Sequence, residues 1–280
     1  MAKLIPRPSF KKPSLPSFHY PHFGPCIQEL RPERESPDLE SAPSRAVASG
    51  RENFQLPSRR AHRQDFPVQI IPYLLVAVAG YLAGSLPTGY LAARARGVDI
   101  RTVGSKNMGA TNVFRVLGKG PGIVVLLVDA MKGWAAIALT RYEIHSHFAD
   151  AGGPNEAIAP IVAGLFAILG HIFTCWLKFK GGKGIATSAG VMVALVPWAL
   201  LISLSTWLVA FVTTRYVSIA SIAGSAVLPV ATWFTTRDLM LTAVTFLVAA
   251  LAIYKHRANV QRLRNGTENR FNFKKKDIAA

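Results

Sequence analysis

Long apolar runs with few or no charges recur along this chain from Val68 onward. Each run is close to the roughly 20 residues that a helix needs to cross about 30 Å of hydrocarbon. Half of the residues are hydrophobic and the mean hydropathy is +0.28, which is too apolar for an ordinary soluble domain. No A-x-A-like cleavage site follows a short apolar segment, so we do not expect a secretory signal peptide. The sequence therefore predicts an integral membrane protein.

The apolar runs predict an all-α membrane domain of about seven transmembrane helices, with motif-bearing loops on its cytoplasmic side. We expect the helices at about Ile70–Arg94, Gly122–Thr140, Ala157–Trp176, Lys183–Val196, Ala199–Thr214, Val217–Phe234 and Leu239–Tyr254. The fourth is short for a full crossing, and we expect a tight turn at Pro197 and Trp198 between it and the fifth.

Residues 1–66 differ from the rest of the chain. They hold 10 of the 18 prolines and 11 Lys or Arg, with almost no periodic apolar pattern. Such a segment cannot bury enough apolar surface to offset the entropy lost on ordering. We therefore divide the chain into a disordered Pro/Arg-rich extension, residues 1–66, and a polytopic membrane domain, residues 67–280.

Basic residues predict how the domain is oriented. The loops after the first and third predicted helices and the tail after the seventh are rich in Lys and Arg, whereas the loops after the second and sixth are not. Cytoplasmic segments are enriched in basic residues, so the first, third and fifth loops and the C-terminus are expected in the cytoplasm and the N-terminus outside. Four arginines between residues 51 and 63 run against this orientation, although long segments cross with less regard to charge.

The net charge of +17 does not indicate nucleic-acid binding, because basic loops are ordinary in membrane proteins and no basic-aromatic interleave is found. Cys26 and Cys175 are too far apart to suggest a disulfide framework or a metal site. With no metal cluster or cofactor motif in the sequence, we expect neither to be required.

The first predicted cytoplasmic loop, Gly97–Arg115, is suited to binding phosphate. It alternates glycines with hydroxyl and amide side chains and closes on an arginine: Gly104, Ser105, Asn107, Gly109, Thr111, Asn112 and Arg115. Glycines let successive backbone N–H groups converge on an anion, Ser, Thr and Asn donate to phosphate oxygens, and an Arg binds two oxygens at once. The alternative is a polar turn that contains glycine for conformational reasons.

The second motif runs from Gly170 to Thr187 and contains Gly181, Gly182, Lys183 and Gly184 directly before the fourth helix. N–H groups and the dipole at that helix start favour an anion. It is not a Walker A loop, because Gly184 stands where Ser or Thr is required. A basic anchor at the membrane surface is the alternative, and His171 is typical of a structural hydrogen-bonding residue.

The third motif has two parts. Ser218 and Ser221 lie three apart at the start of the sixth helix, where they either line a site or pack helices. After the seventh helix, His256, Asn259 and Leu263 share helical spacing in a basic segment. A tail held by anionic lipid explains that segment equally well.

These segments, in this order, resemble the acyl-phosphate-dependent glycerol-3-phosphate acyltransferases of bacteria, the PlsY family. The resemblance covers about residues 70–270 and rests on four blocks: G-S-x-P-T-G at Gly84–Gly89, G-S-x-N-x-G-A-T-N-x-x-R at Gly104–Arg115, G-H-x-F through F-K-G-G-K-G-x-A-T at Gly170–Thr187, and H-x-x-N-x-x-R-L-x-x-G-x-E at His256–Glu268. The family usually has Gly where Lys106 stands and Pro where Met108 and Thr174 stand.

The resemblance implies that residues 67–280 form an acyltransferase domain in the bacterial inner (plasma) membrane. It implies transfer of a fatty acyl group from acyl phosphate to the 1-hydroxyl of sn-glycerol 3-phosphate, which gives lysophosphatidic acid and phosphate, the first acylation of phospholipid synthesis. Both substrates, the membrane lipid and the soluble enzyme that makes acyl phosphate are the expected partners, and nucleic acid is not.

The resemblance also implies roles for individual residues. Ser105, Arg115, Lys183, His256 and Asn259 are implied as catalytic; Gly104, Asn107, Gly109, Thr111, Asn112, Gly181, Gly182, Gly184, Ser218 and Ser221 as substrate-binding; and Glu268 as structural support. No strong general base stands out. Either His256 or the phosphate of the acyl donor takes the proton, and the sequence leaves both open.

Two further features have simpler interpretations. His145 and Asp150 form the H-x-x-x-x-D of acyl-CoA-type acyltransferases, but they fall in a loop expected outside, away from the basic motifs. Asp129 and Lys132 stand at membrane depth with i, i+3 spacing, which predicts a structural pair that faces the bundle.

Two rival classes explain part of the sequence. A small-anion transporter would use basic, glycine-rich loops, but internal repeats are typical of transporters and we find none. A structural membrane anchor would not need loops so dense in Gly, Ser, Asn and Arg.

Overall fold

A computed structural model describes residues 70–148 and 155–271 of the chain. The described residues are helical and contain no strand, which confirms the prediction of an all-α membrane protein. The predicted extension, residues 1–66, lies outside the described residues, and so does Asp150. The division at residue 66 therefore stays a prediction.

Ten α-helices follow one another along the described residues, with the longest described connections between α2 and α3 and between α5 and α6. They are α1 (Ile70–Ser85), α2 (Thr88–Arg94), α3 (Ala110–Leu117), α4 (Lys119–Glu143), α5 (Ile158–Ile172), α6 (Ile185–Leu195), α7 (Pro197–Thr214), α8 (Val217–Thr236), α9 (Leu239–Lys255) and α10 (Arg257–Arg264). A π-helical turn, Ile144–Phe148, extends α4, and a 3₁₀ turn, Cys175–Leu177, follows α5.

In the described residues, five helical segments are long and apolar enough to cross a membrane. They are Ile70–Arg94, Lys119–Ser146, Ile158–Leu177, Pro197–Thr214 and Val217–Thr236. A sixth results if α9 and α10, bent by 47°, form one span, and α6 is a shorter apolar helix. The protein is thus a multi-pass membrane protein, while the count of seven crossings stays a prediction.

The largest differences from the predicted helices occur at Pro87 and in the first motif loop. The predicted first helix is broken into α1 and α2 just before Thr88, because Pro87 has no N–H to donate to the helical ladder. Ala110–Leu117, which we expected to be loop, forms α3. Pro197 is the first residue of α7 and not part of a turn, a position where a missing N–H costs nothing.

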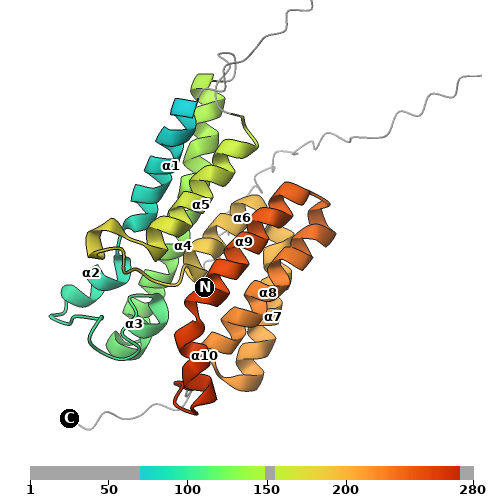
Figure 1. Cartoon of the computed structure of the whole chain (residues 1–280). Helices are drawn as coiled ribbons and strands as arrows, with labels where there is room; N and C mark the ends of the chain where they lie inside the picture. The colour runs from blue at the N-terminus through green and yellow to red at the C-terminus, as the bar shows by residue number, and fades with distance from the viewer. Residues whose placement is uncertain (1–69, 149–154, 272–280) are drawn as a thin grey trace, which may run out of the picture. The chain divides into compact units, whose positions relative to one another are not determined.

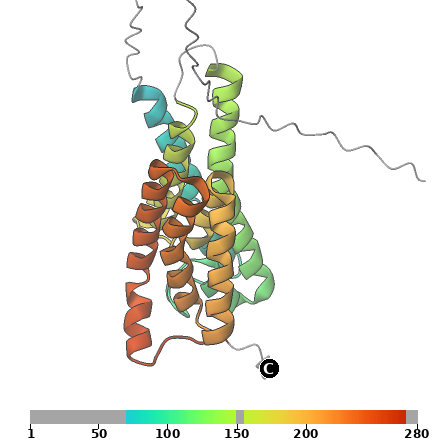
Figure 2. The same cartoon turned by 90° about the vertical axis from the view of Figure 1, so that its right-hand side faces the viewer.

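Two groups of helices pack on either side of α6. Helices α1, α4 and α5 contact one another, α8 contacts both α7 and α9, and α6 contacts members of both groups (Figures 1 and 2). Helices α2, α3 and α10 lie together at one end of these groups (Figure 1).

Glycines allow the closest of these contacts. A Cβ on Gly84 would lie 2.0 Å from the carbonyl oxygen of Ala167, so α1 and α5 touch through backbone. A Cβ on Gly190 would lie 1.8 Å from the carbonyl oxygen of Ala130, so the same holds for α6 and α4. In lipid, where burial of apolar surface gives little drive, such close packing is a main source of helix association.

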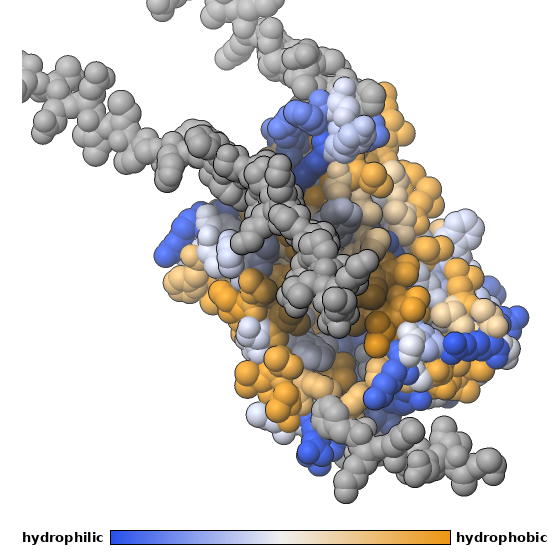
Figure 3. Space-filling view, turned by 180° about the vertical axis from the view of Figure 1, so that it is seen from behind, coloured by the Kyte–Doolittle hydropathy of each residue, from blue (hydrophilic) through white to orange (hydrophobic). Residues whose placement is uncertain are grey.

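Large apolar side chains cover the outer surface of the helices, as expected where they face hydrocarbon. Figure 3 shows them over much of the face opposite that of Figure 1. More than half of the side-chain surface is exposed at Leu74, Leu127, Leu208 and Phe246, which stand on four different helices.

We expect replacement of Lys106 by Gly to stabilise the protein. Lys106 has φ +58°, a left-handed conformation that costs a residue with a Cβ about 1 kcal/mol. Thermal unfolding in detergent should therefore give a higher Tm for Lys106→Gly. Lys180→Gly is the control, because Lys180 is not among the described residues with positive φ and glycine there only adds freedom to the unfolded chain. Equal shifts in both variants would contradict the prediction.

Candidate active site

A cavity of about 350 Å³ lies where the three predicted motifs meet. The residues that line it come from the α2–α3 loop and α3, from the start of α6, from α7, from the start of α8 and from the segment around α10. Among them are Ser105, Asn107, Gly109, Thr111, Asn112, Arg115, Lys183, Gly184, Ser218, Ser221, His256, Asn259, Arg262 and Glu268. Motifs more than 150 residues apart in the sequence thus share one cavity.

The first motif is folded around the side chain of Asn112. Its Oδ1 accepts a hydrogen bond from the backbone N–H of Ser105 at 2.8 Å, and its Nδ2 donates to the carbonyl oxygens of Ile100 and Val103. Gly104, at φ +62°, has no room for a Cβ beside Asn112 Oδ1. These contacts shape the loop, and the expected contact of Asn112 and Gly104 with substrate stays a prediction.

Asn107 lies inside this motif and Arg115 ends it. Asn107 Oδ1 accepts a hydrogen bond from the N–H of Gly109 at 2.8 Å, just before α3 begins at Ala110. Arg115 stands one helical turn and a half further on, and half-burial lowers the pKa of its guanidinium although it remains charged. Ser105 in the loop and Thr111 and Arg115 on α3 all line the cavity, so this motif presents hydroxyl and guanidinium donors to it.

The second motif brings Lys183 to the same cavity. Gly184 precedes α6 at φ +85°, and the first residues of that helix, Ile185 and Ala186, line the cavity. Lys183 Nζ donates a hydrogen bond to Asn259 Oδ1. Burial, together with the nearby Arg262 and Arg115, lowers the pKa of Lys183 to about 8, although Glu268 acts in the other direction.

Gly181 and Gly182 do not line the cavity. They pack on His171, since a Cβ on Gly181 would lie 2.1 Å from its carbonyl oxygen and a Cβ on Gly182 2.1 Å from its Nε2. They therefore support the loop that carries Lys183, and their expected contact with substrate stays a prediction.

The third motif is organised by the carboxylate of Glu268. Its Oε1 accepts hydrogen bonds from Ser218 Oγ at 2.9 Å and from Asn259 Nδ2 at 2.7 Å, and its Oε2 accepts one from Arg262 Nε at 2.7 Å. Burial raises the pKa of Glu268, but these three donors outweigh it and the net pKa is lowered. The charged carboxylate joins α8 to α10.

His256 and Ser221 each have one polar atom engaged by the protein. His256 Nδ1 lies 2.8 Å from the carbonyl oxygen of Ala252, so the proton of the neutral ring is on Nδ1 and Nε2 is left as an acceptor. Ser221 Oγ accepts from Trp207 Nε1 at 3.3 Å. Trp207 lines the cavity as well, and no pattern in the sequence singled it out.

The segment after α10 returns to close the cavity. The N–H of Phe271 donates to the carbonyl oxygen of Arg215 at 2.8 Å, and its ring contacts Phe114 of α3 and Phe211 of α7. Figure 2 shows this segment as it runs from the end of α10 to the α7–α8 turn. A tail that the sequence indicated only as basic is therefore packed against α3 and α7.

His145 is remote from the cavity. It lies in the π-helical turn after α4, 16 residues beyond Asp129, which is the last residue of α4 to line the cavity and is roughly 24 Å away along the helix. The structure therefore places His145 apart from the motifs, as predicted, while Asp150 lies outside the described residues.

The predicted Asp129–Lys132 pair is present. Lys132 Nζ lies 2.8 Å from Asp129 Oδ1, and both side chains are buried. Asp129 and His171 also line the deep part of the cavity, which the sequence did not indicate.

Fold and cavity together define a multi-pass membrane protein with a cationic site at one end of its helices. Three basic side chains, Arg115, Lys183 and Arg262, line the described part of the cavity against the carboxylates of Asp129 and Glu268. Lys132 balances Asp129 and Arg262 balances Glu268, so Arg115 and Lys183 remain for an anion.

Comparison with known proteins identifies the family. The model of the glycerol-3-phosphate acyltransferase family matches residues 74–266. A glycerol-3-phosphate acyltransferase of Geobacter sulfurreducens is 44% identical over 198 residues, which cover 71% of this chain and 97% of the relative. The chain therefore belongs to the glycerol-3-phosphate acyltransferase family, and it is an integral membrane enzyme.

Two solved structures of PlsY, an integral membrane glycerol 3-phosphate acyltransferase, resemble the fold at 36% identity. The glycerol 3-phosphate form has a TM-score of 0.64 and matches 71% of this chain and 96% of its own. The lysophosphatidic acid form has a TM-score of 0.62 and matches 71% of this chain and 95% of its own. The resemblance to the PlsY family seen in the sequence motifs is confirmed.

We expect anion binding to weaken as the pH rises through about 8, where Lys183 loses its charge. Loss of one charged hydrogen bond should raise the Kd for sulfate roughly ten-fold between about pH 7 and about pH 9.5. Sulfate keeps its charge in this range, so isothermal titration calorimetry in detergent reports the protein alone. In Lys183→Arg the side chain stays charged and the Kd should remain level. An equal rise in the wild type and in Lys183→Arg would contradict this assignment.

Proposed function

We propose that this protein transfers a fatty acyl group from acyl phosphate to the 1-hydroxyl of sn-glycerol 3-phosphate, which yields lysophosphatidic acid and phosphate. The observation that carries the proposal is one cavity with a cationic wall and an apolar continuation. The PlsY structures in glycerol 3-phosphate and lysophosphatidic acid forms support this choice of acceptor and product.

The cavity offers two places for a phosphate. On one wall, Ser105, Thr111 and Arg115 supply hydroxyl and guanidinium donors suited to the phosphate of the acyl donor. On the other, Lys183 and Asn259 are hydrogen-bonded to each other beside the start of α6, and they suit the phosphate of glycerol 3-phosphate. Two anions can therefore be held next to each other, each with its own cation.

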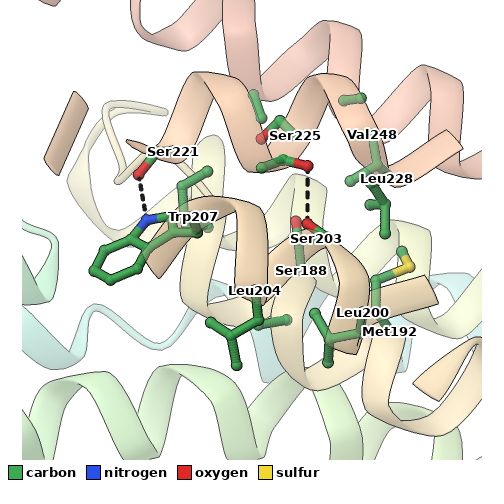
Figure 4. A pocket seen from close by; sticks show the side chains of 15 residues that line it. Ser188, Met192, Leu200, Ser203, Leu204, Trp207, Ser221, Ser225, Leu228 and Val248 are labelled. Carbon is green, nitrogen blue, oxygen red and sulfur yellow. Dashed lines mark hydrogen bonds between the residues drawn. The ribbon is translucent and has the colours of Figure 1, made fainter. Parts of the chain in front are cut away.

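An apolar pocket of about 80 Å³ adjoins the cationic cavity and suits part of an acyl chain. It lies among α6, α7, α8 and α9, and both cavities share Ile185, Ala189, Leu204, Trp207 and Ser221. Figure 4 shows two hydrogen bonds among its polar groups: Ser203 Oγ donates to the carbonyl oxygen of Gly224 and Trp207 Nε1 donates to Ser221 Oγ. Met192, Leu200, Leu228 and Val248 form its apolar end.

The proposed reaction needs positioning more than acid–base strength. The 1-hydroxyl oxygen attacks the acyl carbonyl carbon, a new C–O ester bond forms, and the bond from that carbon to the phosphate oxygen breaks. The electron pair leaves with phosphate, which also takes the hydroxyl proton. Because acyl phosphate is a reactive mixed anhydride, holding the reactants in line and stabilising the departing charge with Arg115 and Lys183 suffices.

We further propose that the protein resides in the bacterial inner membrane with the cavity on the cytoplasmic side. The basic motif segments all belong to the end of the helices that carries the cavity, which agrees with the enrichment of cytoplasmic loops in Lys and Arg. That side would also give access to a soluble enzyme that makes acyl phosphate.

The direct test is product formation by purified protein. With acyl phosphate and glycerol 3-phosphate together, we expect lysophosphatidic acid and one equivalent of phosphate, and with either substrate omitted we expect no lysophosphatidic acid. Uptake of glycerol 3-phosphate into proteoliposomes without acyl transfer would overturn the proposal and favour a transporter.

The proton acceptor can be tested at His256. Loss of a general base costs about 100-fold or more in kcat, whereas a substrate that accepts its own proton leaves kcat within about ten-fold. His256→Gln keeps a hydrogen-bonding side chain, and we expect its kcat to stay within about ten-fold of the wild-type value. A larger loss at unchanged KM would make His256 the base.

The acyl pocket can be tested at Ala189, which both cavities share. Leu at this position would fill the junction, so we expect the KM for palmitoyl phosphate to rise about ten-fold while that for butyryl phosphate stays the same. Val193→Leu on the exposed side of the same helix is the control and should change neither value. A similar KM change for both acyl phosphates would show that the chain lies elsewhere.

A further inference from the structure

The proposed reaction leaves one buried polar cluster unexplained. It consists of Thr88 on α2, Asp129 and Lys132 on α4, and His171 on α5, each with less than a tenth of its surface exposed. Charged groups at membrane depth are costly to bury and usually serve a function. An apolar set of similar volume would hold the helices together as well or better. The cluster therefore calls for an explanation beyond packing.

One oxygen of Asp129 is the centre of the cluster. Lys132 Nζ lies 2.8 Å from Oδ1, Thr88 Oγ1 donates to the same atom, and His171 Nδ1 lies 3.5 Å from it. Lys132 also donates to the carbonyl oxygen of Leu86 at 3.0 Å, in the break between α1 and α2. Among the described residues His171 Nδ1 has no hydrogen-bond partner, so the Asp129 carboxylate contacts the ring at 3.5 Å without a hydrogen bond. The cluster brings α2, α4 and α5 together beside the ring.

The other side of the His171 ring supports the Lys183 loop. A Cβ built on Gly182 would lie 2.1 Å from His171 Nε2, so the ring packs directly on the glycine that precedes Lys183. The backbone continues the contact, because the N–H of Gly182 donates to the carbonyl oxygen of His171 at 3.0 Å. The N–H of Gly181 donates to the carbonyl oxygen of Ile172 at 3.1 Å. The His171 ring therefore sets how closely the Lys183 loop approaches α5.

We infer that Asp129 and His171 are positioning residues that set the place of Lys183 in the cavity through contact of the His171 ring with Gly182. The inference rests on the proposed function, because it assigns Lys183 the phosphate of glycerol 3-phosphate. A charge moved by about 1 Å can cost about 100-fold in rate. The cluster thus links the buried junction of α2, α4 and α5 to the cationic wall.

A double-mutant cycle tests the contact between the His171 ring and Gly182. Gly182→Ala would push its methyl group into the ring and displace Lys183, so we expect the KM for glycerol 3-phosphate to rise by about 100-fold. His171→Ala removes the ring and should raise this KM as well. In Gly182→Ala/His171→Ala the methyl group occupies the vacated space. The double variant should therefore be at least about ten-fold better than the product of the single effects.

Gly181 provides the matched control. Its Cβ would meet the carbonyl oxygen of His171 at 2.1 Å, and removal of the side chain does not move that atom. Gly181→Ala should therefore be harmful whether residue 171 is His or Ala, with effects that multiply. Equal coupling in the two cycles, or none in either, would overturn the inference.

The role of Asp129 is tested with variants of Asp129 and of the His171 ring beside it. His171→Asn retains a donor toward Asp129 but leaves the Gly182 side empty, so we expect the KM for glycerol 3-phosphate to rise while Tm changes little. The pH at which sulfate affinity falls should also move above about 8, because Lys183 gains access to water. Asp129→Asn should show the same pH shift. A loss of Tm in both variants with KM and pH profile unchanged would assign the cluster to stability alone.

These outcomes are separable from failure of the proposed function. If wild-type protein forms no lysophosphatidic acid, the function is wrong whatever the variants do. If the wild type is active and the Gly182 cycle is multiplicative, the function stands and the positioning role is wrong. Thermal unfolding of every variant identifies those that do not fold, and sulfate titration then gives a readout that does not need turnover.

Discussion

The carboxylate of Glu268 holds the cationic cavity in its shape. Three cations close to one another repel, and without a counter-charge Arg115, Lys183 and Arg262 would move apart. Glu268 neutralises Arg262 at 2.7 Å and also accepts from Ser218 and Asn259, and Asn259 in turn accepts from Lys183. This chain of bonds joins α8, α10 and the loop before α6. Arg115 and Lys183 then remain to bind an anion in the cavity.

Small residues allow the polar elements to approach one another in the membrane. Close packing of α6 on α4 at Gly190, and of α1 on α5 at Gly84, brings helices to backbone contact. The same principle acts in the loops, where Gly182 is needed because an imidazole ring occupies the space of a side chain. Glycines that appeared to be ligands for phosphate thus include some that pack against protein. An anion site in this fold depends on glycine both where helices touch each other and in the loops near the anion.

Local sequence patterns predicted most of the fold. Apolar runs of the right length placed the long helices within a few residues, because a segment surrounded by lipid must satisfy its own backbone. The pattern failed for α3, whose eight residues follow a glycine-rich stretch and have no length signal of their own. It also failed to show that Pro87 separates α1 from α2. The break at Pro87 has a local cause, its missing N–H, whereas α3 packs against α4 and there tertiary contacts override propensity.

The sequence by itself determined that the chain enters the membrane and that Gly-, Ser- and Arg-rich segments near Ser105, Lys183 and His256 are suited to phosphate. Composition, charge and short motifs carry that information, since each depends on neighbours along the chain. Only the tertiary structure decided that Asn112 holds the first loop together, that Trp207 lines the cavity, and that His171 supports Gly182. Those partners are set by how the helices pack, and a side chain's neighbours across a helix interface leave no signal in its local sequence.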